Sequence, residues 1–143
     1  MTDSNQKQGL SQAQIDSVIA LYSSGKINEA IDAIKVLNEK FPNVPLLFNI
    51  LGVCYKALGQ LEASIQMFET AVTIKPDYVE AHKNLGITLR ALGQLDISVK
   101  SFKQAIMIES NSVDAHYNLA ITLKELNELE DAVKSYEKAI AIN

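Results

Sequence analysis

The chain repeats itself every 34 residues over most of its length. One series at this spacing has three glycines and one asparagine: Gly25, Gly59, Gly93 and Asn127. A second series has small residues: Ala30, Ser64, Ser98 and Ala132. A third has large apolar or aromatic residues: Ile34, Phe68, Phe102 and Tyr136. A period of this length is typical of stacked supersecondary units that bury their apolar faces against each other. Such stacks present extended recognition surfaces more often than catalytic pockets.

Each period has the pattern of two amphipathic helices. In the third unit, His82, Leu85, Gly86 and Leu89 share one face of a helix predicted over 79–92, and a second helix follows over 95–108. No strand-like alternation occurs in the sequence. We therefore predict an all-α chain with a disordered polar tail over 1–10 and a single domain over 11–143. Its eight helices should form four pairs, over 11–44, 45–78, 79–112 and 113–143.

Two glycines fall inside predicted helices. Gly52 and Gly86 stand one period apart, and Ala120 takes the matching place in the fourth unit. A glycine inside a helix costs about 1 kcal/mol relative to alanine. Its recurrence at one position predicts a steric reason, namely that helix backbones cross closely there.

The overall charge constrains the class of partner. The chain of 143 residues has a formal net charge of −4, which argues against a nucleic-acid partner. No apolar run is long enough to span a bilayer, and the first ten residues lack the apolar stretch of a secretory signal. Cys54 is the single cysteine, which favours a reducing compartment and leads us to expect a cytoplasmic location.

The residues that commonly carry catalysis do not form a recognisable site. His82 and His116 occupy equivalent places on packed faces, without Cys, Asp or Glu at metal-ligand spacing. Cys54 has no histidine close in sequence and is predicted to be a buried, inert thiol. We therefore predict a protein that is not an enzyme and that has no metal site and no cofactor.

The repeated residues resemble the tetratricopeptide repeat, whose pattern is W-x2-L-G-x2-Y, then A-x3-F, then P. The second unit matches it best, with Phe48, Leu51, Gly52, Tyr55, Ser64, Phe68, Ala71 and Pro76. The resemblance covers residues 11–143 and implies a right-handed α-solenoid. It also implies that the first helix of each pair lines a concave groove, in which a protein or peptide partner binds.

The groove residues follow from this resemblance. They lie opposite the packed faces of the first helices: Asn49 and Lys56; Lys83, Asn84, Ile87 and Arg90; Tyr117, Asn118, Ile121 and Lys124. Lys56, Arg90 and Lys124 are one period apart and are expected to form a row of cations, although lysines on such faces are often merely solvated. An asparagine amide both donates and accepts, so Asn84 and Asn118 could pair with a peptide backbone.

The asparagines carry a narrower resemblance. The triplets NLG and NLA, and the stretch AHYNLAITLKEL, look like the repeats of protein O-linked N-acetylglucosamine transferases. In that family an asparagine ladder holds extended substrate polypeptide. Here the ladder has two rungs, because Ile50 and Asp16 occupy the corresponding places in the second and first units.

The two ends of the repeat array differ. Gln14 and Ser17 make the first unit polar where an apolar face is expected, which fits an N-terminal cap. At the other end, Val133, Tyr136 and Ile140 are expected to face the place where a fifth repeat would stack. Either the chain is a fragment of a longer protein, or this uncapped helix pair is covered by self-association as a homodimer.

Three functions remain open at this point. The first is a non-catalytic scaffold that binds an extended peptide or a partner helix in the concave groove. The second is the substrate-recruiting arm of a larger modifying enzyme, such as a glycosyltransferase. The third is an assembly module that self-associates through its last helix pair.

Overall fold

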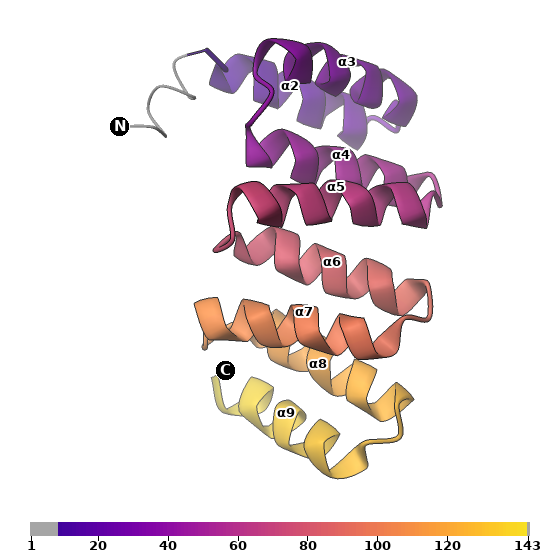
Figure 1. Ribbon diagram of the computed structural model, residues 1–143, viewed down its shortest axis with the longest axis vertical. Helices are drawn as coiled ribbons and strands as arrows, with labels where there is room; N and C mark the ends of the chain where they lie inside the picture. The colour runs from indigo at the N-terminus through magenta and orange to yellow at the C-terminus, as the bar shows by residue number, and fades with distance from the viewer. Residues whose placement is uncertain (1–8, 143) are drawn as a thin grey trace. The chain divides into compact units, whose positions relative to one another are not determined.

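The computed structural model describes residues 9–142, and within them it forms eight helices in four pairs (Figure 1). The pairs are α2 (Gln12–Ser23) with α3 (Ile27–Lys40), α4 (Pro45–Ala57) with α5 (Leu61–Ile74), α6 (Val79–Ala91) with α7 (Leu95–Ile108), and α8 (Val113–Glu125) with α9 (Leu129–Ile142). No strand occurs between residues 9 and 142. The predicted all-α fold is confirmed, and each pair lies inside the residue range expected for its unit.

The chain divides into two compact units, one ending at Ile74 and the other beginning at Lys75. In the N-terminal unit each of the helices α2 to α5 packs on the next. In the C-terminal unit α6 to α9 do the same, and α6 also contacts α8 directly. Most of the predicted tail over 1–10 lies outside the described residues, but Leu10 at its end is buried in the core of the N-terminal unit.

The first helix of every pair ends at a residue with a left-handed backbone. The φ angles of Gly25, Gly59 and Gly93 are +79°, +76° and +86°, and that of Asn127 is +63°. After each of them, the next amide donates to a carbonyl five residues earlier, as in the 2.9 Å bond from Gln94 to Leu89. This is the Schellman arrangement, which satisfies a carbonyl at the end of the helix. The predicted helix ends are therefore confirmed.

The glycines inside α4 and α6 have a specific neighbour. A Cβ atom added to Gly52 would lie 2.6 Å from the ring of Phe68, and one added to Gly86 would lie 2.7 Å from the ring of Phe102. Both rings are fully buried. The steric reason predicted for these glycines is confirmed, but the atoms that need the space belong to an aromatic ring of the paired helix and not to its backbone.

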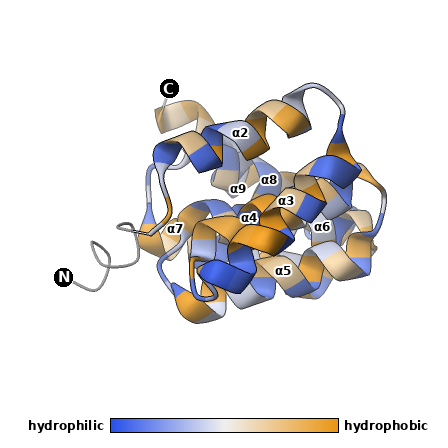
Figure 2. Cartoon of the chain, turned by 90° about the horizontal axis from the view of Figure 1, so that it is seen from above, coloured by the Kyte–Doolittle hydropathy of each residue, from blue (hydrophilic) through white to orange (hydrophobic). Residues whose placement is uncertain are grey.

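The core of each unit lies between its helices. In the N-terminal unit it includes Val18, Ile34, Leu47 and Cys54, and in the C-terminal unit Phe102, Leu119 and Leu123, among other residues. The helices carry apolar and polar stretches on different faces, as their colouring shows (Figure 2). Cys54 is completely buried, as predicted, and burial raises the pKa of its thiol.

The polar residues of the first helix serve its N-terminus. The side chain of Ser11 accepts a hydrogen bond from the backbone amide of Gln14, and the Gln14 side chain accepts one from the amide of Ser11. This is a capping box, which satisfies amides that have no partner within the helix. Gln14 was expected only to make this face polar; its role in starting α2 is an addition from the structure.

Candidate functional site

The residues predicted to line a groove lie along α6 and α8 in the C-terminal unit. These two helices contact each other, so equal positions of the third and fourth repeats become neighbours. Asn84, Ile87, Asn118 and Ile121 are each half-buried, between the packed core and solvent. We call the surface formed by Lys83, Asn84, Ile87, Arg90, Tyr117, Asn118, Ile121 and Lys124 the α6/α8 face.

A polar contact joins the two helices of this face. The Nη1 atom of Arg90 donates to Oδ1 of Asn118 over 3.1 Å, and its contact with the Asn118 backbone carbonyl is 3.5 Å. The side-chain Nδ2 atom of Asn118 donates to the backbone carbonyl of Asp114 over 2.8 Å. The amide group of Asn118 therefore has a defined orientation, with its oxygen toward Arg90.

The carbonyls behind the two asparagines are occupied in the same way. The hydroxyl of Thr88 donates to the carbonyl of Asn84 over 2.7 Å, and that of Thr122 donates to the carbonyl of Asn118 over 2.8 Å. Both threonines are fully buried. The two repeats therefore match in the hydrogen bonds that these backbone carbonyls accept.

Lys83 is the cation of the face that has acidic neighbours. Its ammonium lies 2.8 Å from a carboxylate oxygen of Glu80 and 3.9 Å from one of Asp114. The Lys83 side chain is only 13 % exposed, whereas the two carboxylates are largely in solvent. Lys83 thus links α6 to the start of α8, and a partner would have to compete for its charge.

Tyr117 lies at the edge of the face, on its α9 side. Its ring packs edge-on against that of Tyr136, with 5.9 Å between the ring centroids and an angle of 66° between the ring planes. The Tyr117 side chain is still 52 % exposed. This aromatic pair connects the face to the last helix and leaves one ring available to solvent.

The other predicted site residues are less closely grouped. Lys124 is exposed on α8, one turn beyond Ile121. Lys56 and Asn49 belong to α4 in the N-terminal unit, and Asn49 is buried, with 9 % of its surface exposed. Of the expected row of cations, the C-terminal unit contains Arg90 and Lys124, and Arg90 is hydrogen-bonded to Asn118.

The two histidines hold backbone carbonyls, which the sequence pattern did not reveal. Nε2 of His82 donates to the carbonyl of Pro76, and Nε2 of His116 donates to the carbonyl of Ser110, each over 2.8 Å. Both rings are buried, as expected for packing residues. A histidine stands six residues after Pro76 and another six residues after Ser110, and this repeated spacing is the signal from which the two hydrogen bonds could have been inferred.

Between residues 9 and 142, no group of three or more His, Cys, Asp or Glu side chains is placed to hold a metal ion. Over the same range, no helix has the length and apolar character that crossing a bilayer requires.

Comparisons with known proteins agree with the repeat pattern. A tetratricopeptide repeat model matches residues 113–143, and a TPR repeat model matches residues 52–89 and 88–127. No curated protein sequence matched the chain.

Solved structures of MamA are similar in fold. One crystal structure of MamA has a TM-score of 0.85 at 19% identity, and the match covers 90% of this chain and 75% of the MamA chain. MamA 41-end from Desulfovibrio magneticus RS-1 has a TM-score of 0.84 at 17% identity, and the match covers 92% of this chain and 75% of that chain. At these identities the likeness establishes a common fold. Since the TPR repeat model alone matches more than half of the residues, the chain belongs to the tetratricopeptide repeat family.

Proposed function

We propose that this chain is a non-catalytic protein-interaction module that binds an extended segment or a helix of a partner protein along the α6/α8 face. The observation that carries the proposal is the contact between Arg90 and Asn118, which fixes a polar group of one repeat against the next. An asparagine amide has two donor hydrogens and two acceptor lone pairs, and a guanidinium has five donors. After their mutual contact, both groups keep bonding capacity for a partner.

The chemistry of the face suggests how a partner would be held. Asn84 and Asn118 would pair with its backbone, in the manner of the asparagine ladder that the sequence resembles. Ile87 and Ile121 would contact its apolar side chains. Arg90 and Lys124 would attract acidic groups, and their effect would weaken as salt is added because exposed charges are screened. Such a face suits a partner with few basic residues.

A recruiting role within a larger enzyme would use the same face. In that setting, the module would present substrate polypeptide to a catalytic domain such as a glycosyltransferase. The asparagine resemblance motivates this alternative. It differs from a free-standing scaffold in what is attached to the module and not in how the face binds.

The test compares two double variants against any partner isolated with the full chain. Asn84→Ala/Asn118→Ala removes both amides, whereas Asn28→Ala/Asn111→Ala removes two exposed amides elsewhere and serves as the control. Because a hydrogen bond contributes about 0.5–1.5 kcal/mol, the first variant should weaken binding roughly 5- to 100-fold. The control should bind as the wild type does. Unchanged affinity of the first variant, at an unchanged Tm, would rule out this face.

Self-association is a second candidate, favoured by the outer surface of α9. Val133 is 53 % exposed and Ile140 is 74 % exposed, and the two lie about two turns apart on the same side of the helix. The equivalent residues of α7, Val99 and Ile106, pack into the core beside α8. Sedimentation of the wild type at high concentration should show a dimer that Val133→Glu/Ile140→Glu abolishes. A wild-type monomer would exclude this role.

A further inference from the structure

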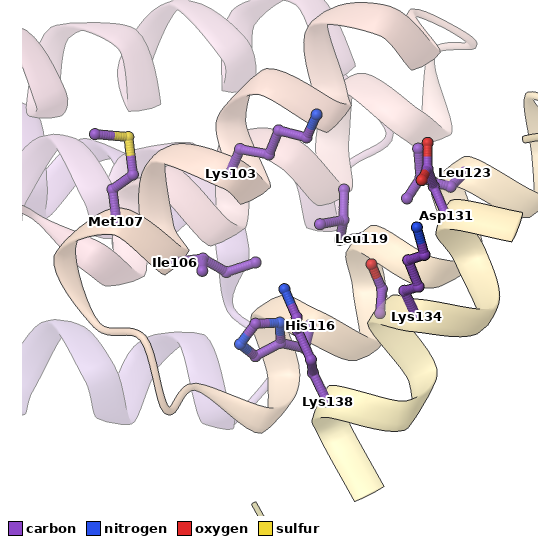
Figure 3. A pocket seen from close by; sticks show the side chains of 10 residues that line it. Lys103, Ile106, Met107, His116, Leu119, Leu123, Asp131, Lys134 and Lys138 are labelled. Carbon is purple, nitrogen blue, oxygen red and sulfur yellow. The ribbon is translucent and has the colours of Figure 1, made fainter. Parts of the chain in front are cut away.

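A hollow lies between α7, α8 and α9, away from the α6/α8 face. It encloses about 450 Å³ and is open to solvent. Its lining comes from all three helices: Lys103, Ile106 and Met107; His116, Leu119 and Leu123; Asp131, Lys134, Ser135 and Lys138 (Figure 3). Apolar side chains form its floor, and charged side chains stand at its rim.

Three residues that line the hollow are smaller than their counterparts in the second repeat. Those counterparts, 68 residues earlier in sequence, are Phe48 for His116, Tyr55 for Leu123 and Met67 for Ser135. Tyr55 and Met67 pack against the core of the N-terminal unit. The replacement of Met67 by a serine removes the side chain that would otherwise reach toward the floor. The third repeat shares these three residues with the fourth, because His82, Leu89 and Ser101 stand one period before them, whereas the second repeat does not.

The rim carries an excess of positive charge in a chain that is acidic overall. Lys103, Lys134 and Lys138 surround the hollow, and Asp131 is its one acidic lining residue. The counterparts of the lysines are Lys35, Gln66 and Thr70 two periods earlier and Glu69, Lys100 and Gln104 one period earlier, so neither of these sets has all three charges. Within residues 9–142, none of the three ammonium groups has a carboxylate within 4 Å. A bound anion would therefore be attracted to this rim.

We propose that this hollow binds a short acidic segment of another protein, with one large apolar side chain on the floor and its neighbouring carboxylates at the lysines. The volume accommodates one or two large side chains. Small-molecule sites normally enclose most of their ligand. This hollow is open to solvent, which suits a peptide because the rest of the peptide chain has to continue outside the site. The inference is independent of the α6/α8 face, because it uses other residues and another side of the unit.

The first experiment uses defined peptides with the full chain. The probe is a blocked, fluorescently labelled pentapeptide of sequence EELFE, and the matched peptides are QQLFQ, which has no charge, and EESSE, which has no apolar side chains. We expect EELFE to bind more tightly than either, and its affinity to fall as salt rises from about 50 to 300 mM. In two-dimensional NMR, the amides of Ser135, His116 and Ile106 should shift. Dodecanoate is included as a small apolar carboxylate.

Two variants then test the rim and the floor separately. Lys134→Gln/Lys138→Gln should weaken EELFE binding roughly 3- to 30-fold. Lys26→Gln/Lys40→Gln removes the same charge from exposed positions in the N-terminal unit and should have little effect. Ser135→Met restores the residue of the second repeat, so it should fill the hollow and abolish binding without lowering Tm. If Ser135→Met fails to fold, the lysine pair remains decisive.

Several results would overturn the proposal. These are no binding of EELFE at millimolar concentration, equal binding of QQLFQ, or shifts confined to the α6/α8 face. Binding of dodecanoate without binding of EELFE would make the hollow a small-molecule site instead. The asparagine variant Asn84→Ala/Asn118→Ala should leave EELFE binding unchanged, which separates this site from the proposed function.

Discussion

The hydroxyl of Ser98 on α7 donates a buried 2.6 Å hydrogen bond to the backbone carbonyl of Gly86 in the middle of α6. The second repeat contains the same bond at the same length, from Ser64 to Gly52. Where the helix has a glycine, the paired helix thus has a serine. The fourth repeat has Ala120 and Ala132 at these positions, and the first has Val18 and Ala30. The small residues of the two helices therefore vary together.

Loss of this hydroxyl should destabilise the C-terminal unit. Ser98→Ala removes a buried hydrogen bond and leaves the Gly86 carbonyl with one contact fewer, so we expect a loss of about 1 kcal/mol in the free energy of unfolding. The measurement is urea denaturation followed by circular dichroism. Ser101→Ala is the control, because the Ser101 hydroxyl has only a longer, 3.3 Å contact within its own helix. An equal loss for both variants would contradict the assigned role.

Replacing the glycine by alanine should also be destabilising, although alanine is the better helix former. Gly86→Ala gains about 1 kcal/mol in helix propensity, but its Cβ would meet the ring of Phe102 at 2.7 Å. Overpacking of this kind costs about 1–3 kcal/mol, so a net loss of up to about 2 kcal/mol is expected.

The ring can be tested as the cause of that loss. Phe102→Leu should cost less in the Gly86→Ala background than in the wild type, and a double-mutant cycle of unfolding free energies measures the difference. Ala120→Gly in the fourth repeat should lose only the propensity term of about 1 kcal/mol. Additive effects of Gly86→Ala and Phe102→Leu would show that the ring is not responsible.

The left-handed residue of the fourth repeat gives a third prediction. Asn127 has φ of +63°, a conformation that costs residues with a Cβ about 1–2 kcal/mol, and asparagine less. Asn127→Ala should therefore lower the free energy of unfolding by about 1 kcal/mol. Asn127→Gly, which restores the residue of the other three repeats, should be neutral or slightly stabilising. If the two variants have equal stability in thermal unfolding, the conformational argument fails.

The buried thiol gives a prediction about pH. Burial raises the pKa of Cys54 above its ordinary value of 9.0, so the folded protein keeps the thiol proton at a pH where the unfolded chain loses it. The unfolded state then binds fewer protons, and stability from this group falls as pH rises above 9.0. Below that pH the contribution is constant. The wild type should lose stability between pH 9 and 10.5 more steeply than Cys54→Ala, by at most about 1.4 kcal/mol per pH unit.

Labelling provides a second measurement of the same group. A thiol reagent at pH 7.5 should modify folded Cys54 at least about 100-fold more slowly than the unfolded chain, because the reactive thiolate is scarce and covered. Rapid labelling of the folded protein would contradict the burial of Cys54. The rate also reports how often the N-terminal unit opens.

The sequence was sufficient to predict the elements that depend on local rules. Left-handed residues at Gly93 and Asn127 end helices wherever they occur, and the spacing of apolar residues determines which face of each helix is buried. The glycine at position 86 was predicted to answer a steric need, but its partner was not identified, because the ring of Phe102 reaches it across a helix pair. Repetition reveals that a contact exists, and only the packed structure reveals which atoms make it.

The candidate sites were less predictable for the same reason. Asn118 was singled out by its position, yet its orientation depends on Arg90, which is 28 residues away in sequence. The hollow beside Ser135 is lined by residues of three separate helices. A small residue in one helix leaves an opening only if its neighbours are also small, so no single residue in the sequence predicts the hollow.

The histidine bonds bear on how such repeats can be exchanged. His116 lies in the fourth predicted unit, but the carbonyl that it holds belongs to Ser110 in the third. Each histidine ring bonds to a backbone carbonyl and not to a side chain. For this reason a proline can provide the acceptor for His82 and a serine the acceptor for His116. A repeat transplanted into another array from residue 113 onward would leave half of this bond behind. The transferable block therefore begins in the preceding loop, at residue 110, and donor and acceptor should be moved together.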